Sequence, residues 1–89
     1  MKISCRASAG TLESSDAYVE IEPGCGAVDV QIQSVVAAQF GAQIERTVRE
    51  VLEECGVEDA SIRVVDRGAL ECVLRARVET AVLRGKEHA

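Results

Sequence analysis

One short segment of the chain combines a turn with two adjacent hydroxyl groups. Residues 10–16 read Gly-Thr-Leu-Glu-Ser-Ser-Asp and lie between two short apolar runs. Serine and aspartate favour turns because their side chains hydrogen-bond to nearby backbone groups, so this composition by itself predicts a hairpin loop. Such a loop would place Ser14 at its exposed tip. A hydroxyl there is suited to accept a group that another enzyme attaches.

Catalysis by this segment is disfavoured. A nucleophilic serine needs a general base within reach, and neither a histidine nor a lysine lies near Ser14 in the sequence. Glu13 and Asp16 could form a carboxylate pair for acid and base chemistry, but an exposed turn offers no difference in environment that would give them separate roles. We therefore expect no catalytic residue in this chain.

The cysteines and the histidine do not form a recognisable site. Cys5, Cys25, Cys55 and Cys72 are widely separated, and His88 is the only histidine. No two cysteines have the close spacing of a zinc or redox motif, so we expect free thiols and no metal site. Cys55 and Cys72 fall on predicted apolar helix faces, where cysteine acts as a small hydrophobe.

Composition excludes several classes of partner. The net charge is −5, and acidic and basic residues are interleaved, so there is no basic stripe to neutralise the phosphates of a nucleic acid. No apolar run approaches the roughly 18 residues of a membrane span. The first six residues contain no apolar stretch typical of a signal peptide. We expect a cytoplasmic protein that binds neither nucleic acid nor membrane.

The elements on either side of the loop read as strands. Residues 17–22 alternate apolar and polar side chains, as a half-buried strand does. If residues 9–12 form its antiparallel partner, then residues 13–16 are the connecting turn. The Pro-Gly-Cys-Gly segment at 23–26 ends the strand, and residues 28–33 alternate again.

The rest of the chain changes to helical periodicity. Residues 35–55 predict a helix, 60–65 a further strand and 69–84 a second helix. The apolar stripe of the first helix comprises Phe40, Ile44, Val48, Val51, Leu52 and Cys55. The stripe of the second comprises Leu70, Val73, Leu74, Val78, Ala81 and Val82.

This order of elements indicates an α+β fold in a single domain spanning residues 1–89. We expect a small two-layer sandwich, in which two helices pack on one face of a mainly antiparallel sheet of three to four strands. Residues 1–8 would form an N-terminal arm, and residues 85–89 a frayed tail. The pattern leaves the order of the strands open.

Four segments of the chain resemble the acyl carrier protein of citrate lyase, also called its gamma chain. The most specific is Ala-Gly-Thr-Leu-Glu-Ser-Ser-Asp at residues 9–16, close to the N-terminus as in that family. The others are Asp-Val-Gln-Ile at 29–32, Gln-Phe-Gly at 39–41, and the run from Asp66 to Arg77. They occur in the family's order along nearly the whole chain.

The resemblance implies a carrier rather than an enzyme. It implies that Ser14 is linked by a phosphodiester to 2'-(5''-phosphoribosyl)-3'-dephospho-CoA, whose thiol holds acetyl and citryl thioesters while citrate is cleaved to acetate and oxaloacetate. The implied partners are the transferase (alpha) and lyase (beta) subunits and the synthase that attaches the group. Ser15 carries the same hydroxyl, and only the family's motif selects Ser14.

Other functions remain open at this stage. The equivalent subunit of malonate decarboxylase uses the same type of prosthetic group. A non-covalent interaction module would bind a partner through its helices or an open sheet edge, with Ser14 as a plain turn residue. A small thiol redox protein is the least favoured, because it rests only on the four cysteines.

Overall fold

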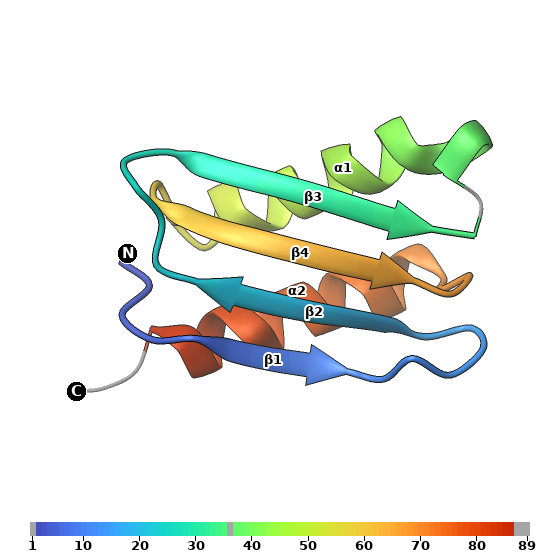
Figure 1. The fold of residues 1–89 in the computed structure, drawn as a ribbon, viewed down its shortest axis with the longest axis horizontal. Coiled ribbons are helices and arrows are strands. Elements are labelled where there is room, and N and C mark those ends of the chain that lie inside the picture. The colour runs from blue at the N-terminus through green and yellow to red at the C-terminus, as the bar shows by residue number, and fades with distance from the viewer. Residues whose placement is uncertain (1, 36, 87–89) are drawn as a thin grey trace.

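The computed structural model describes residues 2–35 and 37–86, which form four strands and two helices (Figure 1). The strands are β1 (Ala7–Gly10), β2 (Ala17–Glu22), β3 (Val28–Ser34) and β4 (Ala60–Asp66). The helices are α1 (Ala37–Glu54) and α2 (Glu71–Gly85). The expected α+β architecture is confirmed.

The sheet has the strand order β1-β2-β4-β3. β1 pairs with β2, and β2 with β4, in antiparallel fashion, whereas β3 runs parallel to β4. The parallel pair arises because α1 carries the chain from the end of β3 back to the start of β4, which is the usual way to join parallel neighbours. The sheet is thus mixed, with antiparallel pairing in the majority.

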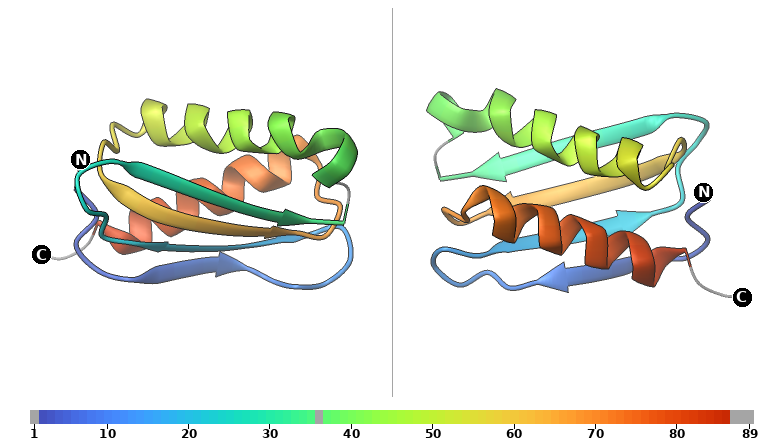
Figure 2. Two further views of the ribbon diagram at one scale, coloured as in Figure 1. Left: turned by 45° about the horizontal axis from the view of Figure 1, so that its top comes forward. Right: turned by 180° about the vertical axis from the view of Figure 1, so that it is seen from behind.

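Both helices pack on one face of the sheet, as predicted (Figure 2). Alternation along the strands points one set of side chains toward them: Val19 and Ile21 of β2 and Ile62 and Val64 of β4 are buried. The helices contribute Val48, Val51, Leu52, Val78, Ala81 and Val82 to the same core. Burying each aliphatic side chain of this size contributes roughly 1.5–3 kcal/mol, so the aliphatic residues stabilise the fold without a buried aromatic side chain.

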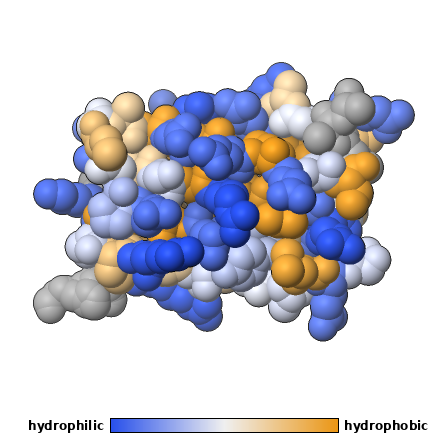
Figure 3. Space-filling model, in the orientation of Figure 1, coloured by the Kyte–Doolittle hydropathy of each residue, from blue (hydrophilic) through white to orange (hydrophobic). Residues whose placement is uncertain are grey.

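The opposite face of the sheet carries charged side chains, which colour the centre of Figure 3 as hydrophilic. Glu20 accepts hydrogen bonds from Arg63 at 2.8 Å and from the Tyr18 hydroxyl at 3.0 Å. The hydrogen bond from Arg63 is the main cause that lowers the pKa of Glu20, and that from Tyr18 adds to it. The polar positions of the alternation are therefore satisfied at the surface.

The N-terminal residues are tied to the end of α2. Ile3 is buried in the core, and the backbone N–H groups of Ser4 and Cys5 both donate to the Gly85 carbonyl, at 2.9 and 3.1 Å. Residues 7 and 8, which the sequence assigned to an arm, already belong to β1. Gly85, assigned to a frayed tail, is buried as the last residue of α2; residues 87–89 lie outside the described part of the chain.

Three residues that the sequence placed on apolar helix faces are exposed. Phe40 at the start of α1 is 48% exposed, Leu70 just before α2 is exposed, and so is Cys72. Periodicity identifies the face of a helix, but it does not tell how far along that helix a neighbouring layer covers the face. The prediction that these three side chains are buried was therefore wrong.

Candidate functional site

Ser14 lies in the turn that joins β1 to β2. The N–H of Asp16 donates to the carbonyl of Glu13 at 3.2 Å, which closes a four-residue turn with Ser14 and Ser15 at its centre. Ser15 has a φ of 65°, in the left-handed region. Both serines are exposed, as the sequence predicted for Ser14.

Asp16 organises the hydrogen bonds of this loop. Its carboxylate accepts from the Thr11 hydroxyl at 2.7 Å and from the Ala17 N–H at 2.7 Å. Arg77 of α2 adds two further hydrogen bonds, from Nε to Oδ1 at 2.9 Å and from Nη2 to Oδ2 at 3.1 Å. A bidentate pair of this kind gives directional specificity as well as attraction. The two ends of the loop are thereby clamped to α2.

The ionisation of Asp16 follows from these contacts. The hydrogen bonds from Arg77, first, and from Thr11 and the Ala17 N–H hold the pKa of Asp16 well below its usual range. The same pair raises the pKa of Arg77. Asp16 is consequently a permanent carboxylate near neutral pH, and it is engaged as a structural acceptor. An acid–base role together with Glu13 is not compatible with that state.

A second anchor joins the loop to the segment after β4. The Ser15 N–H donates to the Arg67 carbonyl at 2.8 Å, and the Arg67 N–H donates to the Asp16 carbonyl at 2.9 Å. These bonds continue the ladder beyond its last pair, Ala17 with Asp66. The Arg67 side chain is exposed and makes no ion pair among the residues that the structure describes.

Gly10 permits the close approach of the two strands before the loop. Its φ of 90° lies in the left-handed region, and a Cβ there would overlap the Ala17 carbonyl oxygen. The same Cβ would also lie 3.1 Å from Cδ of Arg77. Only glycine fits this position without displacing the strand partner or the arginine of the clamp.

The Ser14 hydroxyl itself is left available. Within residues 2–35 and 37–86 it makes no hydrogen bond, and no histidine or lysine contacts it. The surrounding bonds hold the backbone of the turn, while the side chain is exposed. The arrangement lacks a base that could activate a nucleophile, but it presents a hydroxyl that an external enzyme can reach.

Hydrophobic side chains are exposed at the same end of the molecule. Leu12 lies in the loop, Val35 follows β3, and Phe40 and Leu70 lie near the starts of the two helices. Figure 1 shows the β1–β2 loop, the end of β4 and the starts of both helices together at the right-hand end. Figure 3 shows the most hydrophobic surface of the sheet face toward that end. Exposed apolar residues that gather in this way are typical of interaction sites.

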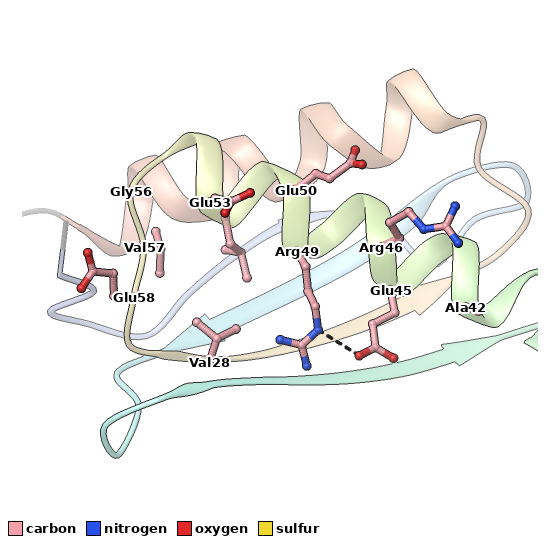
Figure 4. A pocket seen from close by; sticks show the side chains of 11 residues that line it. Val28, Ala42, Glu45, Arg46, Arg49, Glu50, Glu53, Gly56, Val57 and Glu58 are labelled. Carbon is pink, nitrogen blue, oxygen red and sulfur yellow. Dashed lines mark hydrogen bonds and ion pairs between the residues drawn. The ribbon is translucent and has the colours of Figure 1, made fainter.

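A groove of about 780 Å³ lies between α1 and β3 and includes no residue of the β1–β2 loop (Figure 4). Its lining is partly apolar, with Val28, Leu52 and Val57, and partly charged, with Arg49 donating to Glu45 at 2.9 Å. It contains no cysteine, serine or histidine. The groove therefore offers no thiol, hydroxyl or imidazole that could carry an attached group.

The cysteines do not assemble into a site. Cys5, Cys25, Cys55 and Cys72 are free thiols. Burial raises the pKa of Cys55, which lowers the share of reactive thiolate. In the described part of the chain, no three histidine, cysteine, aspartate or glutamate side chains lie close enough together to hold a metal ion. No helix among these residues is long and apolar enough to cross a bilayer. His88 lies outside the described residues.

Sequence reasoning missed most of the residues that hold the loop. Thr11, Arg67 and Arg77 were not singled out for the loop, although all three lie in segments that carry the family resemblance. Arg77 is 61 positions from Asp16, so nothing in the local sequence links the two. A charged partner for Asp16 could be expected on general grounds, but the sequence could not identify Arg77 as that partner.

Comparison with known proteins agrees with the resemblance seen in the sequence. Residues 4–85 match the family model described as malonate decarboxylase delta subunit (MdcD). The chain is 53% identical over 89 residues to the citrate lyase acyl carrier protein of Haemophilus influenzae (strain Rd), covering 100% of this chain and 93% of that protein. It is 51% identical over 88 residues to the protein of the same name from Klebsiella pneumoniae, covering 98% and 91%.

A solved structure shares the fold. A chain in the crystal structure of a Pseudomonas malonate decarboxylase hetero-tetramer in complex with malonate superposes with a TM-score of 0.73 at 22% sequence identity. The match covers 94% of this chain and 91% of that chain. At this identity the likeness supports the architecture of the domain and no more.

Proposed function

The chain belongs to the family of citrate lyase acyl carrier proteins, and we propose that Ser14 is the residue that carries its acyl-bearing group. The observation that carries the proposal is the exposed Ser14 hydroxyl, unbonded within the described residues, on a turn whose backbone is pinned on both sides. Ser15 is less suited, because its backbone N–H is engaged with Arg67 and its φ is positive.

The group proposed at Ser14 is 2'-(5''-phosphoribosyl)-3'-dephospho-CoA, linked to Oγ by a phosphodiester. When bound, it supplies a thiol that holds acetyl and citryl thioesters for the transferase (alpha) and lyase (beta) subunits. The residues of this chain hold the backbone of the turn and leave the attachment oxygen exposed. The exposed guanidinium of Arg67, next to the turn, suits the negative charge of the phosphodiester.

A carrier role is also consistent with what surrounds the site. The loop contains a carboxylate that is used structurally, and no base lies beside Ser14 in the described residues. A carrier needs an accessible attachment point and a surface that partner enzymes can grip. The exposed Leu12, Val35, Phe40 and Leu70 at the same end supply such a surface. We propose that the transferase and lyase subunits, and the synthase that attaches the group, approach from this end.

The mass of the protein tests the attachment. Protein produced together with its modifying enzymes should show one adduct of the prosthetic group, mapped to the peptide that contains Ser14. The Ser14→Ala variant should carry no adduct and should support no citrate cleavage in the complex, whereas Ser15→Ala should be modified normally. An unmodified Ser14, or citrate cleavage that survives Ser14→Ala, would overturn the proposal.

The acyl group distinguishes citrate lyase from malonate decarboxylase. Citrate lyase is named by relatives that are more than half identical, and malonate decarboxylase by the family model. We propose that the chain serves citrate lyase, because the relatives at 51–53% identity, which match over 91–93% of their own length, are citrate lyase acyl carrier proteins. The loaded carrier should therefore exchange acetyl for citrate with a citrate lyase transferase subunit; exchange with malonate alone would select the alternative.

A further inference from the structure

A second cavity opens beside the Ser14 loop, between the first turns of α1, the start of α2 and the end of β4. It has a volume of about 360 Å³, within the range of pockets that bind small molecules. Its apolar lining includes Phe40, Ile44, Leu70 and Leu74, and its polar lining includes Thr47 and Asp66. None of these residues has a role in holding the turn around Ser14.

The cavity is continuous with the loop through one residue. Arg67 forms two backbone hydrogen bonds with the loop, to Ser15 at 2.8 Å and to Asp16 at 2.9 Å. The next residue, Gly68, lines the cavity. The backbone that pairs with the Ser14 turn thus continues directly into the wall of the cavity.

Thr47 has an unused hydroxyl in the cavity wall. The residue is only 6% exposed, yet its hydroxyl makes no hydrogen bond with the described residues. No fully enclosed side-chain nitrogen or oxygen in that part of the chain lacks a partner. The Thr47 oxygen is therefore not fully enclosed, and Thr47 is part of the cavity lining. An unpaired hydroxyl at such a position is costly unless a ligand or water bonds to it.

The charges of the lining favour a neutral occupant. Asp66 is 3% exposed and accepts from the Ser34 hydroxyl at 2.8 Å and the Ala69 N–H at 3.0 Å, and Glu71 lies at the start of α2. The cavity has no arginine or lysine in its lining. Phosphate and citrate carboxylates would be repelled, whereas a neutral ring with hydrogen-bond donors and acceptors would be accommodated.

We propose that this cavity binds the adenine base of the group attached to Ser14. The inference rests on the proposed function, because it requires that group. From Ser14 outward, the group consists of a phosphoribosyl unit, adenosine, a diphosphate and pantetheine, so adenine is the first ring with an aromatic face. Phe40, 48% exposed at the cavity, provides a stacking surface. The Thr47 hydroxyl can donate to a ring nitrogen, and the carboxylates of Asp66 and Glu71 can accept from the exocyclic amine.

Binding of the base would divide the prosthetic group into a fixed and a free part. The adenosine end would be held against the carrier, while the diphosphate and pantetheine remain outside the acidic lining. The thiol end is then the part that reaches the partner subunits. Binding of the base would thus shorten the part of the prosthetic group that moves freely and set the direction in which this part leaves the carrier.

Nuclear magnetic resonance on the modified protein tests the inference directly. Phe40 is the only phenylalanine of the chain, so its ring protons can be identified without ambiguity. We expect nuclear Overhauser contacts between the adenine H2 or H8 proton and the Phe40 ring. We also expect the amide signals of Ile44, Thr47 and Leu74 to differ between the unmodified and modified proteins.

Matched variants separate base binding from general effects on the helices. Phe40→Ala should remove the adenine contacts and weaken binding of free adenosine to the unmodified protein roughly tenfold, as expected for the loss of one stacking partner. Thr47→Val, which keeps the shape and removes the hydroxyl, should weaken it several-fold. Leu83→Ala is the control, because Leu83 is also exposed on a helix but lies outside the cavity.

Two outcomes would overturn the inference while leaving the proposed function intact. In the first, an adduct is present on Ser14 but signal changes are confined to residues 10–16 and Arg67. In the second, the Phe40 ring contacts pantetheine methyl protons, or a partner subunit, instead of adenine. If no adduct forms on Ser14 at all, the proposed function fails, and adenosine binding to the unmodified protein still reports on the cavity alone.

Discussion

The guanidinium of Arg77 on α2 spans both carboxylate oxygens of Asp16, at 2.9 and 3.1 Å, across 61 positions of sequence. Asp16 closes the turn that contains Ser14, and Arg77 belongs to a helix that packs against β1 and β2. The pair therefore fixes the position of the surface loop relative to the helices. For the attachment proposed at Ser14, this clamp would offer the modifying enzyme a defined backbone.

Removing the arginine should loosen the loop. In Arg77→Ala, the Asp16 carboxylate keeps only its contacts with Thr11 and the Ala17 N–H. We therefore expect amide hydrogen exchange in residues 11–16 to accelerate several-fold and attachment at Ser14 to slow. Arg75→Ala is the matched control, since Arg75 pairs with Glu50 and Glu54 on α1 and exposed pairs contribute little. Equal exchange in both variants would show that the clamp does not order the loop.

Acid should weaken the same clamp. The pKa of Asp16 is lowered in the folded protein, so its contribution to stability is fully present above the unfolded pKa of about 3.9. It is lost as the pH falls from about 4 toward the lower folded value. Denaturant unfolding of Asp16→Asn should accordingly show a shallower decrease in free energy below pH 4 than the unaltered protein. Glu20, whose pKa is also lowered, should account for part of the remaining slope.

The elements of the fold could be read from periodicity, since they depend on local alternation. Residues 17–22 and 28–33 alternate because one face of each strand meets the helices, and the stripe through Ile44, Val48 and Leu52 has the spacing of a half-buried helix. What the pattern did not show is that β4 lies between β2 and β3. Strand order depends on which surfaces fit together, and alternation is the same for every order.

The site was predictable only in part. The Ser14 turn followed from its residue types, and its choice over Ser15 rested on the family motif. Its supports are long-range, since Arg67 and Arg77 reach the loop from segments that follow β4. The cavity beside it depends on Phe40 and Leu70, which periodicity placed in the core and the structure places at its edge.

A core truncation should unfold the domain more readily than a surface one. Ile62 is 1% exposed at the centre of β4, which pairs with strands on both sides. Ile62→Ala should lower the free energy of unfolding by about 2–5 kcal/mol, through lost burial and a residual cavity. Leu83→Ala, at a position that is 57% exposed, should change it by no more than about 0.5 kcal/mol. Equal effects, measured by urea denaturation, would contradict the assignment of the core.

Two glycines with the same φ separate two effects of adding a side chain near the Ser14 loop: backbone strain and steric overlap. Gly10 and Gly68 both have a φ of 90°. At Gly68 an added Cβ meets nothing within 4 Å, so Gly68→Ala should cost only the strain of the left-handed region, about 1–2 kcal/mol. At Gly10 the Cβ would overlap the Ala17 carbonyl oxygen and crowd Arg77.

Gly10→Ala should therefore be destabilised by clearly more than Gly68→Ala in urea unfolding, because β1 must move away from β2 or the Arg77 side chain must withdraw. Either movement disturbs the clamp on Asp16, so attachment at Ser14 should also slow in Gly10→Ala. Gly68 lines the cavity but not the turn, and Gly68→Ala should be modified at the normal rate. If both variants were equally stable and equally modified, close approach at Gly10 could not be a requirement for presenting Ser14.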